Sequence, residues 1–440
     1  MNVMFIMSDT LRKDHLGCYG NPDIVTPHLD AFAATCAKFE NYIAGSFPTM
    51  PTRADIFTAK PSFTGLGWAP LLPEEKILPK ILQEAGYTTA AVVDTPFVIR
   101  GGYNYDLGFK DFEWIRGQLS YEERPKIVSE RRYEEDCFAP RTSISAERCL
   151  EYYHKDKFFL YVDMWDPHEP WDAPAWYTRL YYPEYQGELI RSPYWDWRES
   201  GMTEEELEIG HACYCGEVTM VDRWVGRLLE KLRYMGLLED TIIVFVSDHG
   251  YYFGEHGQLG KCRIQKGQWH RSPLYGEITR IPLLFYVPGL EPRTTTAMVS
   301  PIDLMPTLLE LLGLEVPQGI QGRSFVSVLR GETEDFRDYC VTSLPLSRPG
   351  AKTKIVDNVT RSIEALQVST VTTDKWTLLC GMSDSPAELY DLENDPEESR
   401  NLISENRAEA ERLHRKYVEF LEEAGTAEDL LAPRRELSRL

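Results

Sequence analysis

The stretch TIIVFVSDHG at residues 241–250 constrains the fold more than any other part of the sequence. Residues 242–246 are all apolar, without the polar alternation of a half-buried strand. Such a continuous run is typical of a strand that is buried on both faces of a mostly parallel sheet. The run closes on Ser247-Asp248-His249-Gly250, so polar residues come at the carboxyl end of the predicted strand.

Other segments repeat this pattern and alternate with predicted helices. Further strands are predicted at Val3–Met7, Thr88–Val93, 158–162 and Ile281–Val287, and helices at Leu29–Ala37, Leu78–Ala85, Glu204–Leu232 and Ile302–Leu312. The sequence therefore predicts an α/β fold with a large, mostly parallel sheet sandwiched by helices. Ligands of such sheets bind at the carboxyl ends of the strands. The polar residues expected there are Asp9, Asp94, Asp163–His168 and Asp248–His249.

The texture of the sequence changes after about residue 335. Residues 364–380 are typical of two antiparallel strands that meet at Thr373-Asp374, and residues 404–424 form a charged amphipathic helix. We therefore expect a catalytic α/β domain over residues 1–335 and a small α+β subdomain over residues 336–440.

The composition excludes several classes of partner. The 440 residues have a formal net charge of −22, which repels nucleic acid and anionic membranes. The nine cysteines form no C-x-x-C pair and are interpreted as free thiols in a reducing compartment. With no signal-peptide pattern and no apolar run long enough to span a bilayer, the sequence predicts a cytoplasmic protein.

Asp248 and His249 have the chemistry of a metal-ligand pair. Adjacent residues at a strand end can reach one ion if the chain turns there, and Gly250 permits the turn. Asp9, after the first strand, offers a second carboxylate. Oxygen and nitrogen ligands suit Zn²⁺ or Mn²⁺ best, with Mg²⁺ or Ca²⁺ as alternatives. Alone, each of these residues would more often be a detail of a turn.

The segment SFPTMPTRADIFT at residues 46–58 is typical of a loop that turns into a helix. It places Thr49, Pro51 and Arg53 at tight spacing. One interpretation is a proline-stiffened loop with a helix cap. The other is a nucleophile, a rigid turn and a positive charge that holds the transferring group.

Six motifs in order decide between these interpretations. They are SDTLRKDHLGCYG, TMPTRADIFT, WDPHEPW, SDHGYYFGEHGQLGK, SPIDLMPTLLELLGLEVP and ELYDLENDPEESRNL. Together they resemble the sulfatase family of the alkaline phosphatase superfamily over nearly the whole chain. The second resembles the family's C/S-x-P-x-R nucleophile motif.

The resemblance implies a role for each matching residue. The implied metal ligands are Asp9, Thr49, Asp248 and His249, around one divalent ion. The implied catalytic residues are Thr49, Arg53, Lys261 and His168. Thr49 would be the nucleophile, and Arg53 would hold the nucleophile loop and stabilise the transferring group. Lys261 would bind a substrate oxygen, and His168 would lie near the leaving group. The ion, Arg53, Lys261 and His168 would together supply the local positive charge that an anionic substrate needs in an acidic protein.

The sequence departs from the family pattern at three places. Thr49 stands where a Cys or Ser is oxidised to formylglycine, and its β-carbon already carries a methyl group, so no formylglycine is expected. Thr10 replaces a second aspartate, which argues against a second metal in this site. VVDTPFV replaces a Lys-x-His motif. There Thr95 is predicted to bind a substrate oxygen, with an ordinary strand end as the alternative.

The remaining histidines and aromatic residues leave alternatives open. His270 is predicted to line the substrate site, whereas His256 is interpreted as structural, with a place in the lining of the site as the alternative. His211 is interpreted as structural or as lying near the pocket rim. The aromatic-rich segment 165–197 is interpreted as packing of an insertion or as a homo-oligomer interface, with a platform for a sugar or aryl group as the alternative.

We predict a metal-dependent ester hydrolase that acts on a small anionic ester. The leading hypothesis is cleavage of phosphodiesters or phosphonate monoesters by Thr49, with weaker activity on sulfate esters. The alternatives are a sulfatase that works without formylglycine and a catalytically silent protein that binds an anion.

Overall fold

The computed structural model describes residues 1–96, 98, 102–117, 121–266, 268–346, 352–356, 359–362, 368–381 and 386–438. The chain divides into two compact units, each assembled from separate stretches of sequence. The first unit holds residues 1–40, 76–248 and 282–295, and the second holds residues 41–75, 249–281 and 296–440.

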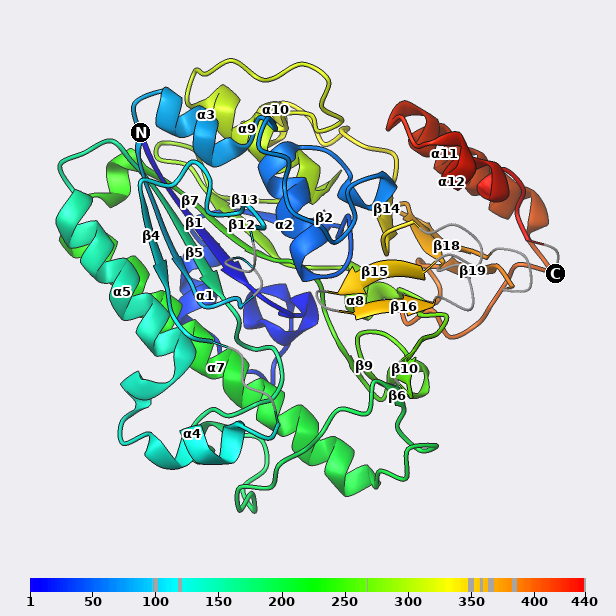
Figure 1. Cartoon of the computed structure of the whole chain (residues 1–440), viewed down its shortest axis with the longest axis horizontal. Helices are drawn as coiled ribbons and strands as arrows, with labels where there is room; N and C mark the ends of the chain where they lie inside the picture. The colour runs from blue at the N-terminus through cyan, green and yellow to red at the C-terminus, as the bar shows by residue number, and fades with distance from the viewer. Residues whose placement is uncertain are drawn as a thin grey trace. The chain divides into compact units, whose positions relative to one another are not determined.

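Most of an eight-stranded sheet belongs to the first unit (Figure 1). Its strands are β1 Asn2–Ser8, β2 Ala37–Tyr42, β3 Thr88–Val93, β4 Asp111–Trp114, β5 Phe158–Met164, β7 Thr241–Ser247, β12 Leu283–Tyr286 and β13 Arg293–Val299. Their order is β13-β2-β12-β7-β1-β5-β3-β4. The strands from β7 to β4 run parallel, whereas β12 is antiparallel to both neighbours.

The three central strands explain why the sequence shows continuous apolar runs. Every residue of β1, β5 and β7 is buried, so neither face of these strands needs polar side chains. The parallel register aligns Ser8 with both Met164 and Ser247. Residues that follow these strands therefore emerge at the same edge of the sheet. This arrangement confirms the predicted fold class.

The helices of the first unit are α1 Pro27–Ala33, α3 Leu78–Glu84, α4 Arg124–Glu130, α5 Phe138–Tyr153, α6 Ala175–Thr178 and α7 Glu204–Tyr234. Thr203 caps α7: its hydroxyl accepts from the Glu206 amide, and the Glu206 carboxylate accepts in return from the Thr203 amide. Helix α5 packs against α7 and against β3 and β5 (Figure 1). Among the described residues, no helix has both the length and the apolar composition to cross a bilayer.

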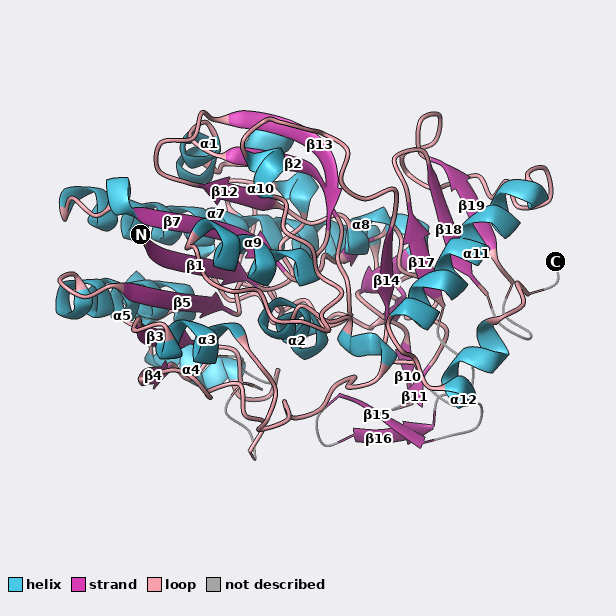
Figure 2. Cartoon of the chain, turned by 90° about the horizontal axis from the view of Figure 1, so that it is seen from above, coloured by secondary structure: helices cyan, strands magenta, loops and turns pink. Residues whose placement is uncertain are grey.

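The second unit contains a smaller antiparallel sheet of β14 Cys340–Ser343, β17 Ser369–Thr372, β18 Trp376–Cys380 and β19 Glu388–Asp391. Helix α11, Arg407–Glu423, lies across it (Figure 2) and buries Leu413 and Tyr417 against Leu378 and Leu389. The remaining helices are α2 Thr49–Thr58, α8 Gly276–Thr279, α9 Leu304–Leu311, α10 Val326–Leu329 and α12 Glu428–Leu431. The other strands within the described residues are β6 Trp195–Asp196, β8 Tyr252–Phe253, β9 Gln258–Gly260, β10 Ile264–Gln265, β11 Gln268–Trp269, β15 Lys352–Val356 and β16 Val359–Ser362.

Most predicted elements are present, with one correction. The expected helix over Leu29–Ala37 is too long, because α1 ends at Ala33 and Ala37 already begins β2, which pairs with β12. The antiparallel strands on either side of Thr373-Asp374 are confirmed, although residues 364–367 of that prediction lie outside the described residues. All nine cysteines fall within the described residues and are free thiols. The boundary at residue 335 stays a prediction.

Candidate active site

Two predicted metal ligands lie side by side in the first unit. Asp9 follows β1 and Asp248 follows β7, and these strands are neighbours in parallel register. Each side chain is fully buried, and the two carboxylates have oxygens within 4.8 Å of each other. Buried carboxylates this close repel each other unless a proton or a cation lies between them. The pair therefore fits a divalent cation.

Thr10 holds both carboxylates in place. Its amide donates to Asp248 Oδ1 over 2.9 Å, and its hydroxyl donates to Asp9 Oδ1 over 2.7 Å. The backbone there has a φ of 63°, which β-branched residues rarely adopt. Thr10 therefore replaces the charge of a second aspartate with two hydrogen bonds to the remaining carboxylates.

The predicted nucleophile lies in the second unit, beside His249. Thr49 is the first residue of α2, is 1% exposed, and has a strained φ of 29°. Its hydroxyl oxygen is 3.5 Å from Nε2 of His249. Nδ1 of His249 lies 3.0 Å from the Gly250 carbonyl oxygen, and the ring packs edge-on against Phe47. A carbonyl can only accept, so the proton is on Nδ1, and Nε2 presents a lone pair toward Thr49.

Arg53 and Asp55 fix the start of α2. Arg53 is 1% exposed, and its guanidinium donates to the Thr49 carbonyl over 3.1 Å. Asp55 accepts from the amide and the hydroxyl of Ser46, each over 2.7 Å, and from the Ser62 amide over 2.7 Å. Burial raises the pKa of Asp55 to about 7, although these hydrogen bonds oppose the shift. Asp55 was not predicted as a site residue, because its only signal in the sequence is its place in the motif.

Lys261 and His270 also belong to the second unit. Lys261 is buried directly after β9. His270 is half-buried after β11, and its amide donates to the Arg263 carbonyl over 2.9 Å. The contacts of both side chains with a substrate stay predictions.

His168 and Thr95 lie in the first unit. His168 is buried, with Nδ1 2.6 Å from the Glu169 carbonyl and its ring centroid 3.9 Å from that of Trp165. Its other ring nitrogen is therefore the one suited to proton transfer. Thr95 is buried, and its hydroxyl donates to Asp163 over 2.9 Å. This bond favours the strand-end interpretation of Thr95, and its role toward substrate stays a prediction.

Buried carboxyl groups surround the loop of His168, and two of them, Asp172 and Glu217, were not predicted from the sequence. Burial raises the pKa of Asp166 to about 7, and the charge of Asp172 adds to the shift. Burial also raises the pKa of Asp94 and of Glu217 well above the ordinary range, with the charge of Asp166 adding to both. Glu217, from α7, accepts from the Ala173 amide over 2.6 Å. Its contribution was not visible in the sequence because it comes from a distant helix.

The aromatic-rich segment contains both buried and exposed rings. Trp165, Trp171, Tyr177 and Trp197 are each at most 5% exposed, whereas Trp176 is 56% exposed. Tyr177 belongs to a buried cluster with residues of α7. This burial favours the packing interpretation for these four buried residues.

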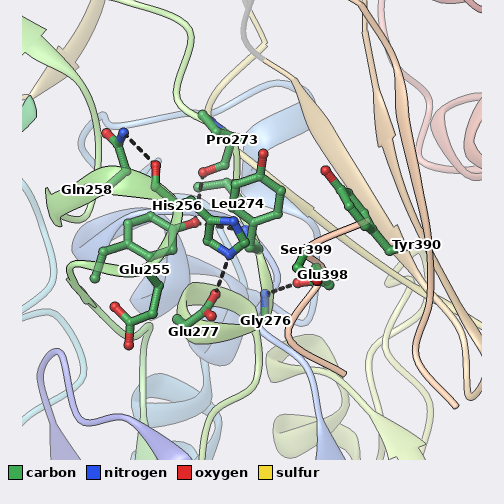
Figure 3. A network of polar contacts seen from close by, with 12 residues as sticks. Glu255, His256, Gln258, Pro273, Leu274, Gly276, Glu277, Tyr390, Glu398 and Ser399 are labelled. Carbon is green, nitrogen blue, oxygen red and sulfur yellow. Dashed lines mark hydrogen bonds and ion pairs between the residues drawn. The ribbon is translucent and has the colours of Figure 1, made fainter. Parts of the chain in front are cut away.

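His256 forms a polar network in the second unit (Figure 3). Its Nε2 is 3.4 Å from Glu277 Oε2, and its ring stacks on Tyr275 with centroids 3.8 Å apart. Burial lowers the pKa of His256, but the hydrogen bond and charge of Glu277 outweigh it, helped by the charge of Glu398, so the pKa lies above its ordinary value. These contacts favour the structural interpretation of His256.

We expect the His256–Glu277 pair to stabilise the protein at low pH. Because the folded-state pKa is raised, the contribution is fully present below the unfolded value of about 6.5 and is lost as pH rises through the folded value. Replacing His256 with Gln should cost about 1 kcal/mol below pH 6 and less above pH 8. Thermal unfolding of both proteins across this range measures the difference, and a gap that widens with rising pH would contradict the assignment.

Comparison with known proteins places the chain in a family. The family model for sulfatases matches residues 1–314. An ulvan-active sulfatase of Formosa agariphila is 28% identical over 351 residues, which are 75% of this chain and 65% of that protein, so the chain spans about two thirds of this relative. A multifunctional alkaline phosphatase superfamily protein of Trinickia caryophylli is 27% identical over 76% of this chain and 78% of its own length.

A solved structure shares the fold. The crystal structure of a phosphonate monoester hydrolase of Agrobacterium radiobacter matches with a TM-score of 0.77 and 20% identity, over 96% of both chains. At this sequence identity the match shows a shared fold and nothing more. The family model spans most of the chain, and the chain therefore belongs to the sulfatase family.

Proposed function

We propose that this sulfatase-family protein is a metal-dependent hydrolase of singly charged phosphorus esters and that Thr49 is its nucleophile. The observation behind the proposal is the environment of Thr49. Its hydroxyl is buried at the start of α2, faces Nε2 of His249 and has the Arg53 guanidinium one turn away. A threonine that served only as a helix cap would need none of these neighbours.

The donor set supports one divalent ion held by Asp9, Asp248 and His249, with Thr49 as a further ligand. Asp248 and His249 are consecutive residues, so the imidazole directly follows one of the two carboxylates along the chain. When bound, such an ion lowers the pKa of a hydroxyl and offsets negative charge on the equatorial oxygens of the reacting group. Carboxylate and imidazole ligands favour Zn²⁺ or Mn²⁺ over Ca²⁺ or Mg²⁺.

The reaction would proceed in two displacements. The Thr49 hydroxyl releases its proton to solvent water and its oxygen attacks phosphorus, while the bond from phosphorus to the leaving oxygen breaks. His168 gives a proton to that leaving oxygen, while Arg53 and Lys261 balance charge on the oxygens that stay. Water then attacks phosphorus in the Thr49 ester, which releases the acid product and restores the hydroxyl.

Thr49 also governs the choice of substrate. A formylglycine hydrate can expel sulfate from its own second hydroxyl, but the ester of Thr49 must be broken by water at the central atom. Phosphorus supports this direct displacement, because nearby cations stabilise its equatorial oxygens. A phosphodiester or phosphonate monoester also carries one negative charge, as a sulfate ester does, which suits a single ion.

The names of the relatives favour a second candidate function. A related chain is a sulfatase, so sulfate ester hydrolysis without formylglycine is the alternative reading of the same residues. The multifunctional relative is consistent with one site that serves more than one ester class.

The test compares esters that share one leaving group. Protein reloaded with Zn²⁺ or with Mn²⁺ is assayed on an aryl phosphodiester, an aryl phosphonate and an aryl sulfate. We expect kcat/KM for a phosphorus ester to exceed that for the sulfate by about 100-fold, a difference of about 2.7 kcal/mol in transition-state stabilisation. A higher kcat/KM for the aryl sulfate than for both phosphorus esters would contradict the proposal and favour the sulfatase hypothesis.

A further inference from the structure

A second group of metal-ligating side chains lies in the first unit and takes no part in the proposed reaction. His15 comes from the loop after β1, and His211 and Cys215 come from α7. Nε2 of His15 is 2.7 Å from Nε2 of His211, and Sγ of Cys215 is 3.6 Å from the same His211 atom. One donor atom from each residue lies within 4.8 Å of the other two.

The two residues of α7 share one face of the helix. His211 and Cys215 are four residues apart, and residues at this spacing are neighbours on the helix surface. His15 reaches them from a segment about 200 residues earlier in the sequence. His15 and Cys215 are 6% and 5% exposed, and His211 is more accessible than either. An ion could therefore enter on the side of His211.

Asp14 prepares His15 for this role. Nδ1 of His15 is 2.9 Å from Asp14 Oδ1, and Asp14 is in turn held by Nε of Arg12 over 2.9 Å. A carboxylate can only accept here, so the proton is on Nδ1 of His15, and Nε2 presents its lone pair to the group. Carboxylates placed behind metal-bound histidines orient them in this way.

The spacing matches a zinc site closely. Zinc–sulfur and zinc–nitrogen bonds of about 2.3 and 2.1 Å in a tetrahedron place sulfur and nitrogen about 3.6 Å apart and two nitrogens about 3.4 Å apart. The Sγ–Nε2 distance already has this value. The two imidazoles would have to separate by about 0.7 Å, a small rotation of either ring. Without an ion, the same two nitrogens share one hydrogen bond in which His211 donates.

We infer that His15, His211 and Cys215 form a second metal site, suited to Zn²⁺ and separate from the proposed catalytic residues. Binding moves the His211 proton to its other ring nitrogen and releases the Cys215 thiol proton to solvent, so one proton is freed for each ion bound. The fourth position is left to water. Two imidazoles and a thiolate select Zn²⁺ over Mg²⁺ or Ca²⁺, which prefer oxygen ligands.

The role of this ion would be structural. Tyr214 lies between its two helical ligands, and its hydroxyl accepts from the Arg12 amide over 2.8 Å and donates to the Thr10 carbonyl over 2.9 Å. The ring of Tyr214 also packs edge-on against His15. An ion that joins His15 to α7 would therefore fix the loop in which Thr10 holds the predicted ligands Asp9 and Asp248.

The experiment uses the whole chain, stripped of metal and titrated with Co²⁺ and then Zn²⁺. Co²⁺ bound to a thiolate gives a charge-transfer absorption in the near ultraviolet, which oxygen and nitrogen ligands do not. We expect this absorption in the wild type, in Cys213→Ala as the matched control, and in Asp248→Asn, which changes only the other site. Cys215→Ala should lack it, and His211→Gln should weaken Co²⁺ binding about 100-fold or more.

A graded variant separates a metal site from a hydrogen-bonded cluster. Asp14→Asn keeps all three ligands and should weaken Zn²⁺ binding about 10-fold, as expected for a residue behind the ligands. Circular dichroism verifies that each variant is folded. The inference is overturned if folded wild-type protein shows no thiolate absorption with Co²⁺, or if Cys215→Ala binds Zn²⁺ as tightly as the wild type. Because Asp248→Asn retains this site, either result is independent of the proposed hydrolase function.

Discussion

Thr49→Ala protein should fold like the wild type and lose at least about 10³-fold in kcat on its best ester, which is about 4 kcal/mol. The loss follows because alanine has no oxygen to form the covalent ester. Folding should persist, because the lost hydroxyl makes only a long contact of 3.5 Å with His249 and alanine keeps the β-carbon at this position. Steady-state assays measure kcat, and thermal unfolding measures the stability of the fold.

Two further variants make this result specific. Thr49→Ser keeps a hydroxyl on the β-carbon and removes only the γ-methyl group, so it should retain activity within about 10-fold. Thr58→Ala is the matched control: it removes a hydroxyl from the same helix, one that donates to the Ala54 carbonyl over 2.7 Å. Wild-type turnover by Thr49→Ala would remove Thr49 from the mechanism.

The strands could be predicted almost to the residue. An apolar run that is buried on both faces has no polar interruption, so β1 and β7 begin and end where the sequence changes character. The end of α1 was missed for the opposite reason. Nothing local separates Ala33 from Ala37, and the strand that starts at Ala37 depends on pairing with β12, about 250 residues later.

The sequence predicted which residues form the candidate site, but it did not predict the hydrogen bonds between them. The sequence shows that Thr10 is not an acid, but it does not show that its amide and hydroxyl bind both carboxylates. It places His249 in a ligand pair without indicating which ring nitrogen faces Thr49. These details depend on backbone angles and on distant chain segments, which residue patterns do not record.

The group of His15, His211 and Cys215 shows the same limit. The spacing of His211 and Cys215 on a predicted helix was visible, yet it is common in helices that bind nothing. The pair becomes a candidate metal site only because His15 lies beside it, and His15 belongs to a motif that was assigned to another site. Because that motif was interpreted through Asp9, no separate role was considered for His15.

Asp248→Asn protein should lose about 10³-fold or more in turnover and one of its bound divalent ions. Asparagine keeps the oxygen that accepts from the Thr10 amide, so the loop geometry should survive. It removes one of two charges whose oxygens lie within 4.8 Å. Metal-free Asp248→Asn should therefore be at least as stable as the metal-free wild type, because the repulsion with Asp9 is relieved.

Saturating Mn²⁺ should reverse this order of stability. An ion at 100 times its dissociation constant adds about 2.7 kcal/mol to the wild type, and a variant that cannot hold the ion gains almost nothing. Asp222→Asn is the control, since it neutralises another buried carboxylate, one that accepts from the Leu29 amide over 2.6 Å. Unfolding curves with and without Mn²⁺, together with elemental analysis, test the assignment without any substrate. If Asp248→Asn is stabilised by Mn²⁺ as much as the wild type, Asp248 is not a ligand, and the repulsion between the two carboxylates must be relieved by a proton.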